Sequence, residues 1–480
     1  MRKTKIVCTI GPATSSEAMI EKLVNVGMDV ARLNFSHGSH DDHKKVIDAI
    51  RSVSVRMHKP ITILQDLQGP KLRTGKIKNG KIELVEGATI SITTDEVLGT
   101  SDMISTSYKY LPDDVKIGDI ILLDDGMMQL QVTGVEPKKV ICEVIEGGYL
   151  SDHKGINLPN VAISQPSLTS KDRKDLDFGI ANDVDLVAMS FVRSADDVQR
   201  VKDIIAENGK QILVVAKLEK PEAIEHLEEI MYVTDGVMVA RGDLGVEVPL
   251  EKVPPLQKKI IHLAMRLGKP VITATQMLES MRFNSRPTRA EVSDVANAIF
   301  DGSDAVMLSA ETAVGQYPVE TIKTMHRIIV EAERTLHTPM CQQVYYDEEG
   351  LSIPDAISRS ACEAADGLDA KAIVAFTKSG FTGRQVSKYR PGTSIITFTP
   401  SAVVKNQLNL SWGVIPMNME FKTSTEEIIK QMEELLLQKQ VVQRGDVVVI
   451  LMGAPIYIQG TTNLMKLHVI GDGSDVKSLG

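Results

Sequence analysis

The chain has 480 residues and a formal net charge of −9. This length exceeds one ordinary hydrophobic core and predicts two or three domains. Apolar residues make up 43% of the chain and no long basic run is present, which argues against a nucleic-acid or membrane-surface partner. The four scattered cysteines lack C-x-x-C spacing, which fits a reduced compartment better than a zinc site. No apolar run is long enough for a signal peptide or a membrane span, so we expect a cytoplasmic protein.

Eight short apolar segments rich in Val and Ile occupy the first 310 residues. Each ends in polar, glycine or charged residues, and a helix-like segment follows. Because apolar and polar residues do not alternate strictly, these segments fit strands covered on both faces, as in a parallel sheet. Eight such β-then-α units favour a closed (β/α)8 TIM barrel, and the alternative is an open doubly wound sheet. The expected strands are residues 5–11, 28–38, 61–69, 184–192, 211–220, 236–243, 270–276 and 304–312.

Two regions depart from this pattern. Residues 71–168 contain short, often alternating strands with tight turns, which predict a small inserted β-barrel domain able to act as a lid. After about residue 340 the alternation of helix and strand restarts and predicts a separate α/β domain. The expected domains are therefore a barrel (1–70 and 169–339), a lid (71–168) and a C-terminal α/β domain (340–480).

Charged and polar residues gather where the expected barrel strands end. Active sites of such barrels lie at the C-terminal ends of the strands. Arg32, Asn34 and Ser36 are two residues apart, so their side chains point the same way while the chain is extended. Lys217 and Glu219 share a face by the same spacing. Single charges at strand ends are usually solvated, so it is their convergence on one mouth that favours a functional site.

The residue types in this set are those needed for phosphate chemistry. Glu219 and Asp243 offer the hard oxygen ligands that suit Mg²⁺. Lys217, Arg32 and Arg73 are cations of the kind that neutralise a transferring phosphate group.

Several motifs together resemble one known family. "KIVCTIGPAT", "ARLNFSHG", "LQDLQGPKLRTG", "MVARGDLGVEVP", "ITATQMLESM", "RPTRAEVSDVANAIFDGSDAVMLSAETAVGQYP" and "GTTN" occur in order between residue 4 and about residue 470. In this order they resemble pyruvate kinase. The inserted lid and the C-terminal α/β domain also fit that family.

The resemblance implies transfer of the phosphoryl group of phosphoenolpyruvate to ADP, followed by protonation of the enolate to pyruvate. Glu219 and Asp243 would hold Mg²⁺ or Mn²⁺, and Lys217 would stabilise the phosphoryl group in flight. Thr275, with Ser309 and Glu311 behind it, would form the proton path. The implied substrate-binding residues are Arg32, Gly242, Asp243 and Thr275, and the implied nucleotide-side residues are Asn34, His37, Arg73 and Lys171.

In the C-terminal domain, "FTKSGFTGRQVSKYRP" is similar to the family's effector phosphate loop. Its hydroxyls and cation suit the phosphate of a sugar-phosphate or nucleotide effector, and the alternative is an ordinary strand-to-helix turn. The family position taken here by Phe381 is commonly polar. The expected effector residues are Thr377, Lys378, Ser379 and Thr382, and the resemblance also implies a homotetramer.

One departure concerns potassium. Members of the family that require K⁺ carry Asp-Thr-Lys-Gly-Pro-Glu where this chain has Asp66-Leu67-Gln68-Gly69-Pro70-Lys71. Beyond the shared aspartate, Lys, Glu and bound K⁺ sum to +1, and Gln68 with Lys71 also sums to +1. We therefore expect Lys71 to act in catalysis in place of K⁺, so that K⁺ is not required. The alternative is that Lys71 is a solvated hinge residue at the start of the lid.

Two other functions remain open from the residues alone. A Mg²⁺-dependent aldolase or lyase acting on pyruvate enolate would also need a barrel, two carboxylates and an arginine, but not the nucleotide-side cations Arg73 and Lys171. A non-enzymatic sensor that binds sugar phosphate through the C-terminal domain would have gaps in the barrel-mouth residues, and the sequence contains none.

Overall fold

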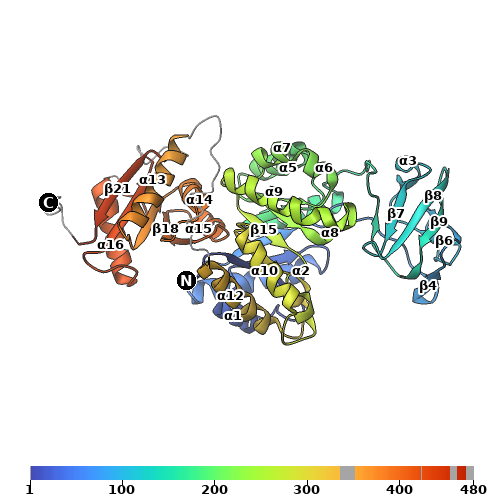
Figure 1. Ribbon diagram of the computed structural model, residues 1–480, viewed down its shortest axis with the longest axis horizontal. Helices are drawn as coiled ribbons and strands as arrows, with labels where there is room; N and C mark the ends of the chain where they lie inside the picture. The colour runs from blue at the N-terminus through green and yellow to red at the C-terminus, as the bar shows by residue number, and fades with distance from the viewer. Residues whose placement is uncertain (1, 336–351, 423, 454–461, 472–480) are drawn as a thin grey trace.

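The computed structural model describes residues 2–335, 352–422, 424–453 and 462–471. A central barrel separates a small β domain, drawn in cyan, from an α/β domain drawn in orange and red (Figure 1). The predicted domain boundary at 339/340 and the first half of the "GTTN" motif lie outside the described residues. Within the described ranges, no helix is both long enough and apolar enough to cross a membrane.

Eight parallel strands close into the predicted barrel, and the open doubly wound sheet is thereby excluded. Their spatial order is β1-β16-β15-β14-β13-β12-β3-β2. One apolar cluster fills the barrel interior and a larger one lies between the strands and the outer helices, which explains the continuous apolar runs. The strands are β1 (Lys5–Ile10), β2 (Val30–Asn34), β3 (Thr62–Asp66), β12 (Leu186–Met189), β13 (Leu213–Leu218), β14 (Gly236–Ala240), β15 (Val271–Ala274) and β16 (Ala305–Leu308).

The outer helices begin at residues that cap them. Ser39, Thr169, Ser194 and Thr288 each accept a hydrogen bond from the backbone three residues ahead, where an Asp or Glu bonds back. Such boxes satisfy amides that lack a partner within the helix. The helices around the barrel are α1 (Glu17–Val26), α2 (His40–Arg56), α4 (Ser170–Ala181), α5 (Ala195–Glu207), α6 (Pro221–Glu225), α7 (Leu227–Val233), α8 (Arg241–Glu247), α9 (Val253–Arg266), α10 (Arg289–Phe300), α11 (Ala310–Ala313) and α12 (Pro318–Thr335).

An aspartate precedes every second barrel strand and binds the strand before it. Asp29 accepts the amide of Ile6 at 2.8 Å, and Asp304 accepts that of Val271 at 3.0 Å. Asp185 and Asp235 do the same for β3 and β13. Each of the four carboxylates also pairs with a Lys or Arg. We refer to Asp29, Asp185, Asp235 and Asp304 as the strand clamps.

The insert between β3 and α4 forms a half-barrel with its own core. Six strands form one sheet in the order β11-β7-β8-β9-β5-β6, and β10 pairs with β4 in a two-stranded ribbon. Hydrogen bonds therefore do not close it into the small barrel expected from the sequence. Its elements are β4 (Lys81–Leu84), β5 (Thr89–Thr93), β6 (Met103–Ser105), α3 (Leu111–Asp114), β7 (Ile120–Leu123), β8 (Met128–Glu136), β9 (Lys139–Glu146), β10 (Gly148–Ser151) and β11 (Ile156–Asn157).

The C-terminal domain is an α/β domain, as predicted. Four parallel strands and one antiparallel edge strand are ordered β19-β18-β17-β20-β21. Separate apolar clusters cover the two faces of this sheet. Its elements are α13 (Ile353–Gly367), β17 (Ala372–Phe376), α14 (Phe381–Lys388), β18 (Ser394–Thr399), α15 (Ala402–Leu408), β19 (Val414–Asn418), α16 (Thr425–Gln438), β20 (Val447–Met452) and β21 (Leu464–Val469).

The C-terminal domain docks on the strand clamps at the N-terminal end of the barrel. Both terminal nitrogens of Arg390 donate to Asp304, each at 3.0 Å. Asp304 also accepts the backbone amide of Trp412 at 3.0 Å. The Trp412 ring covers the Arg390 guanidinium at 5.0 Å from its centroid. Because this ion pair is almost fully buried, loss of one partner would leave an uncompensated charge.

We therefore predict that Arg390→Met destabilises the protein by about 3–5 kcal/mol. Trp412 is the one tryptophan of the chain, so its fluorescence during urea unfolding reports on this interface. Arg334→Met is the matched control, because the Arg334–Glu331 pair is mostly exposed and such pairs contribute at most about 1 kcal/mol. Equal urea midpoints for the two variants would contradict the prediction.

Candidate active site

Lys217 is the centre of a buried charge cluster at the C-terminal ends of the barrel strands. Its ammonium lies 2.8 Å from Glu219 Oε1 and 3.3 Å from Asp66 Oδ1. It also donates to Ser190 Oγ at 2.6 Å. Only 11% of the lysine side chain and 1–2% of the two carboxylates are exposed. Lys217 and Glu219, which their spacing was predicted to place on one face, form an ion pair in the fold.

Burial and charge oppose each other in this cluster. Burial alone would lower the pKa of Lys217, but Asp66, Glu219 and Asp243 raise it well above its ordinary value. Burial would raise the pKa of Asp66, but Lys217 and Arg32 hold it below the usual range. For Glu219 burial prevails and the pKa is raised. Of the two carboxylates, Glu219 thus has the less compensated charge and would gain more from an additional cation.

Arg32 lies beside this cluster on β2. Its Nε donates to Asp66 Oδ2 at 2.7 Å, and one terminal nitrogen donates to Thr9 Oγ1 at 2.8 Å. The sequence reasoning missed both Thr9 and Ser190, which contact the two central cations. Each stands at the end of an expected strand, so the strand-end rule applied to neutral hydroxyls would have found them.

The Arg241–Asp243 segment has a different structure from the one expected. We predicted a strand through residue 243, but β14 ends at Ala240 and Arg241 opens the short helix α8. Arg241 binds the carbonyls of Ala274 and Thr275 at 3.2 and 2.7 Å and pairs with Asp294 at 2.7 Å. The Gly242 amide donates to Thr275 Oγ1 at 2.8 Å. The segment thus joins the ends of β14 and β15 and places Asp243 at the mouth.

Three non-glycine residues at this mouth have positive φ. Phe191, Thr275 and Gln276 have φ values of 53°, 68° and 55°, a region that costs free energy for residues with a side chain. Gly69, at φ 68°, packs so tightly that a Cβ there would lie 2.7 Å from Phe191. The Phe191 amide donates to Glu219 Oε2 at 2.7 Å. Backbone strain at this end is therefore coupled to the position of a predicted metal ligand.

The two predicted metal ligands differ in exposure. Glu219 is buried, whereas the Asp243 carboxylate is 32% exposed and lies 3.8 Å from Lys71 Nζ. Among the described residues, no three His, Cys, Asp or Glu side chains converge as a complete metal site. Two carboxylates with one open side suit Mg²⁺, which usually completes its shell with water and substrate oxygens.

The predicted proton path is not continuous in this structure. Thr275 Oγ1 donates to the Ala274 carbonyl at 2.6 Å. Glu311 is fully buried and accepts the amides of Ser309 and Leu278 at 2.7 and 3.2 Å. No hydrogen bond among the described residues joins Thr275 to Ser309 or Glu311. Burial raises the pKa of Glu311, which suits proton transfer. Its hydrogen bonds to two backbone amides suit a positioning role equally well.

The nucleotide-side predictions fall on two elements. Asn34 is the last residue of β2, whereas Ser36 and the exposed His37 lie beyond the strand in the turn. Lys171 donates to the Phe35 carbonyl and to Asp175, each at 2.6 Å, which ties α4 to that turn. Arg73 belongs to the lid and donates to the His153 carbonyl at 3.1 Å. Barrel and lid therefore supply different members of the set.

The lid faces the mouth across a narrow pocket. Asn157 of β11 donates to Glu247 of α8 at 2.9 Å, and buried Lys220 donates to the same oxygen at 2.7 Å. Lys71 and Asp243 line the same pocket. The contacts of the lid thus reach the helix that carries Asp243.

The predicted effector loop joins β17 to α14. Thr377 and Thr382 are buried, and the Thr382 hydroxyl bonds to that of Thr462 at 2.9 Å. The Ser379 carbonyl accepts from Arg384 at 3.3 Å. Gly380 precedes α14 with φ 81°, so the loop turns sharply into the helix N-terminus.

Comparisons with known proteins agree with this geometry. The family model "Pyruvate kinase, barrel domain" matches residues 1–322, and "Pyruvate kinase, alpha/beta domain" matches residues 355–468. Pyruvate kinases of Staphylococcus aureus strains MRSA252 and USA300 are each 49% identical over 477 residues, covering 98% of this chain and 81% of theirs. A solved pyruvate kinase structure from Cryptosporidium parvum has 39% identity and a TM-score of 0.91, covering 98% of this chain and 96% of that one. The chain belongs to the pyruvate kinase family.

Proposed function

We propose that the barrel mouth transfers the phosphoryl group of phosphoenolpyruvate to ADP and yields pyruvate and ATP. The observation that carries the proposal is the buried Lys217 ammonium between Asp66 and Glu219. A phosphotransferase needs a desolvated cation beside a metal ligand, because charge on the phosphoryl oxygens must be neutralised during transfer.

The residues of the mouth divide this work. A divalent ion at Glu219 and Asp243 would neutralise phosphoryl and carboxylate oxygens. Lys217 would contact the transferring group, and Arg32, held by Asp66 and Thr9, would orient the phosphate. The first turn of α8 would bind the substrate carboxylate through its backbone. Thr275, whose hydroxyl lies beside that turn, would hold the proton for the enolate carbon.

A coupled assay with phosphoenolpyruvate, ADP and Mg²⁺ tests the proposal. Pyruvate and ATP should form in equal amounts, and chelation of the metal should stop the reaction. A Mg²⁺-dependent aldolase or lyase would instead consume pyruvate with an aldehyde and would not need ADP. ATP formation that is independent of phosphoenolpyruvate, or no ATP formation, would contradict the proposed function.

We predict that Lys217→Met lowers kcat at least about 100-fold, because it removes a charge used mainly in the transition state. Binding of phosphoenolpyruvate, measured by calorimetry, should persist. Lys210→Met is the matched control. Lys210 precedes β13, the strand that carries Lys217, and forms an exposed ion pair with Asp183. Near-normal turnover of the Lys217 variant would remove Lys217 from the catalytic step.

Lys71 supports activity without K⁺. Its ammonium lies 3.8 Å from Asp243, and both side chains are only about one-third exposed. This contact with a residue of the mouth favours a role at the site over the alternative of a solvated hinge residue. An ammonium offers three donors to oxygens that a monovalent cation would otherwise coordinate. The proposal is that this covalent cation supplies the charge of K⁺.

We therefore predict full activity in tetramethylammonium salts free of Na⁺ and K⁺. Lys71→Glu should lower activity, and added K⁺ should restore part of it. Lys78→Glu makes the same charge reversal at an exposed lid position and should leave activity and its K⁺ response unchanged. Strong stimulation of the unmodified enzyme by K⁺ would overturn the assignment.

The loop from Thr377 to Thr382 is proposed to bind a phosphorylated effector. The turn into α14 offers backbone amides and hydroxyls that suit a phosphate. The Thr382–Thr462 hydrogen bond would have to be shared with the ligand or exchanged. A cytoplasmic location and a homotetramer also remain proposals.

Ribose 5-phosphate and AMP serve as one sugar-phosphate and one nucleotide probe. We predict that a probe which activates the unmodified enzyme no longer does so in the Ser379→Ala, Thr382→Ala double variant. Turnover without the probe should be unchanged, because the loop lies outside the barrel. Loss of that basal turnover would instead show that the loop is structural.

A further inference from the structure

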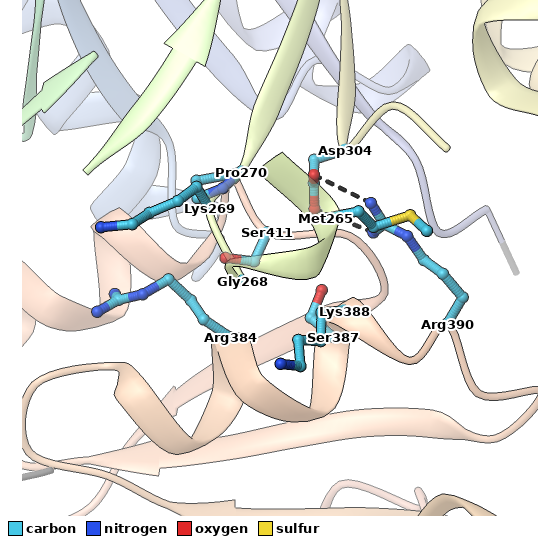
Figure 2. Close-up of a pocket in the computed structure, with 10 residues that line it drawn as sticks. All are labelled: Met265, Gly268, Lys269, Pro270, Asp304, Arg384, Ser387, Lys388, Arg390 and Ser411. Atoms are coloured by element: carbon cyan, nitrogen blue, oxygen red, sulfur yellow. Dashed lines mark hydrogen bonds and ion pairs between the residues drawn. The ribbon is translucent and has the colours of Figure 1, made fainter. Parts of the chain in front are cut away.

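A second pocket lies at the seam between the barrel and the C-terminal domain, at the end opposite the mouth. Gly268, Lys269 and Asp304 line it from the barrel, and residues of α14 line it from the other side (Figure 2). Its volume is about 210 Å³, which includes space that is open to solvent. Four lining residues are cations and one is an acid, in a chain of net charge −9.

Two of the four cations are already neutralised. Arg390 makes its two-point ion pair with Asp304 and also donates to the Gly302 carbonyl at 2.7 Å. Lys388 pairs with Asp355 and donates to the carbonyl of Arg266 at 3.2 Å. These two cations need no further anion.

Among the described residues, the other two cations, Lys269 and Arg384, donate only to backbone carbonyls. Lys269 Nζ donates to the Thr234 carbonyl at 2.7 Å, and Arg384 donates to the Ser379 carbonyl at 3.3 Å. In the parts of the chain that the structure describes, neither has a carboxylate oxygen within 4.0 Å. The acid whose charge acts on both is Asp235, and it is already paired with Lys202 at 2.9 Å.

The two side chains also lie in one electrostatic environment. Burial, opposed by Asp235, lowers the pKa of Lys269 and that of Arg384, and the charge of Arg384 lowers the pKa of Lys269 further. Figure 2 shows both side chains extending to the same side, away from the Asp304–Arg390 pair. Two partly desolvated cations that repel each other would both be stabilised by an anion between them.

We propose that a phosphate group, either inorganic phosphate or the end of a phosphomonoester, binds between Lys269 of the barrel and Arg384 of the C-terminal domain. A guanidinium fork and an ammonium suit a tetrahedral anion. The enclosed part of the pocket is narrow, so the ligand places one small group there and keeps the rest in solvent.

The position of this site links the domains. Gly268 has φ 65°, a conformation that favours glycine, and it lies beside α14, where a Cβ would be in ordinary contact with Gln385 at 3.4 Å. Arg384 also holds the Ser379 carbonyl. A phosphate at this site would therefore bridge the barrel and the helix that follows the loop, whether or not that loop itself binds an effector.

Tungstate, a heavy tetrahedral anion, locates the site directly in crystals of the full chain. An anomalous peak should lie within hydrogen-bond reach of Lys269 Nζ and the Arg384 guanidinium. It should be lost in the Lys269→Gln, Arg384→Gln double variant and retained in Lys259→Gln, which removes an exposed charge from α9, the helix that precedes Lys269. Absence of the peak, or its persistence in the double variant, would overturn the proposal.

Thermal unfolding at matched ionic strength distinguishes the source of the phosphate. Phosphate or glycerol 3-phosphate should raise the Tm of the unmodified protein above that in chloride, and the same Tm rise should need at least about tenfold more ligand in Arg384→Gln. Arg384→Lys, which keeps the charge, should restore much of the effect. If glycerol 3-phosphate gives the same Tm rise at a lower concentration than phosphate, the ligand is a phosphomonoester; if both need the same concentration, free phosphate suffices. The same concentration dependence in Arg384→Gln and in the unmodified protein would refute the site.

Discussion

The carboxylates that precede alternate barrel strands are the constraint on which the rest of the architecture depends. Each strand clamp accepts an amide of the neighbouring strand and is itself neutralised by a Lys or Arg. An unpaired amide or carboxylate at this depth would cost free energy, so clamp, strand and cation stabilise one another. The N-terminal end of the barrel thereby holds the stabilising ion pairs, and the opposite end carries the strained backbone around Glu219.

At the mouth, stability and chemistry have opposite requirements. Asp66 is stabilised by two cations, whereas burial leaves Glu219 with a raised pKa. Left-handed residues at 191, 275 and 276 add backbone strain around the same point. A divalent ion and an anionic substrate would relieve both the charge imbalance and the desolvation, so part of their binding free energy comes from a site that is unfavourable by itself.

Asp304 connects the barrel to the C-terminal domain. Its carboxylate accepts the Val271 amide at the start of β15 and also accepts hydrogen bonds from Arg390 and the Trp412 amide. The seam pocket lies next to this pair. Any shift of α14 relative to the barrel would therefore act on strands whose other ends reach Gly242 and Thr275. The rigid β-strands provide a physical connection between the two ends of the barrel.

The sequence by itself determined the strands, their direction and the identity of the charged residues at the mouth. Continuous apolar runs followed by helices require a parallel sheet, and parallel strands bring Lys217, Glu219 and Arg32 to one end. Only the tertiary structure decided which partners these residues have. Thr9 and Ser190 contact the central cations, Arg241 holds the Thr275 carbonyl at the end of β15, and Glu311 binds backbone amides. Such contacts join residues distant in the chain and depend on how the barrel closes, whereas strand direction and residue identity are local properties of the sequence.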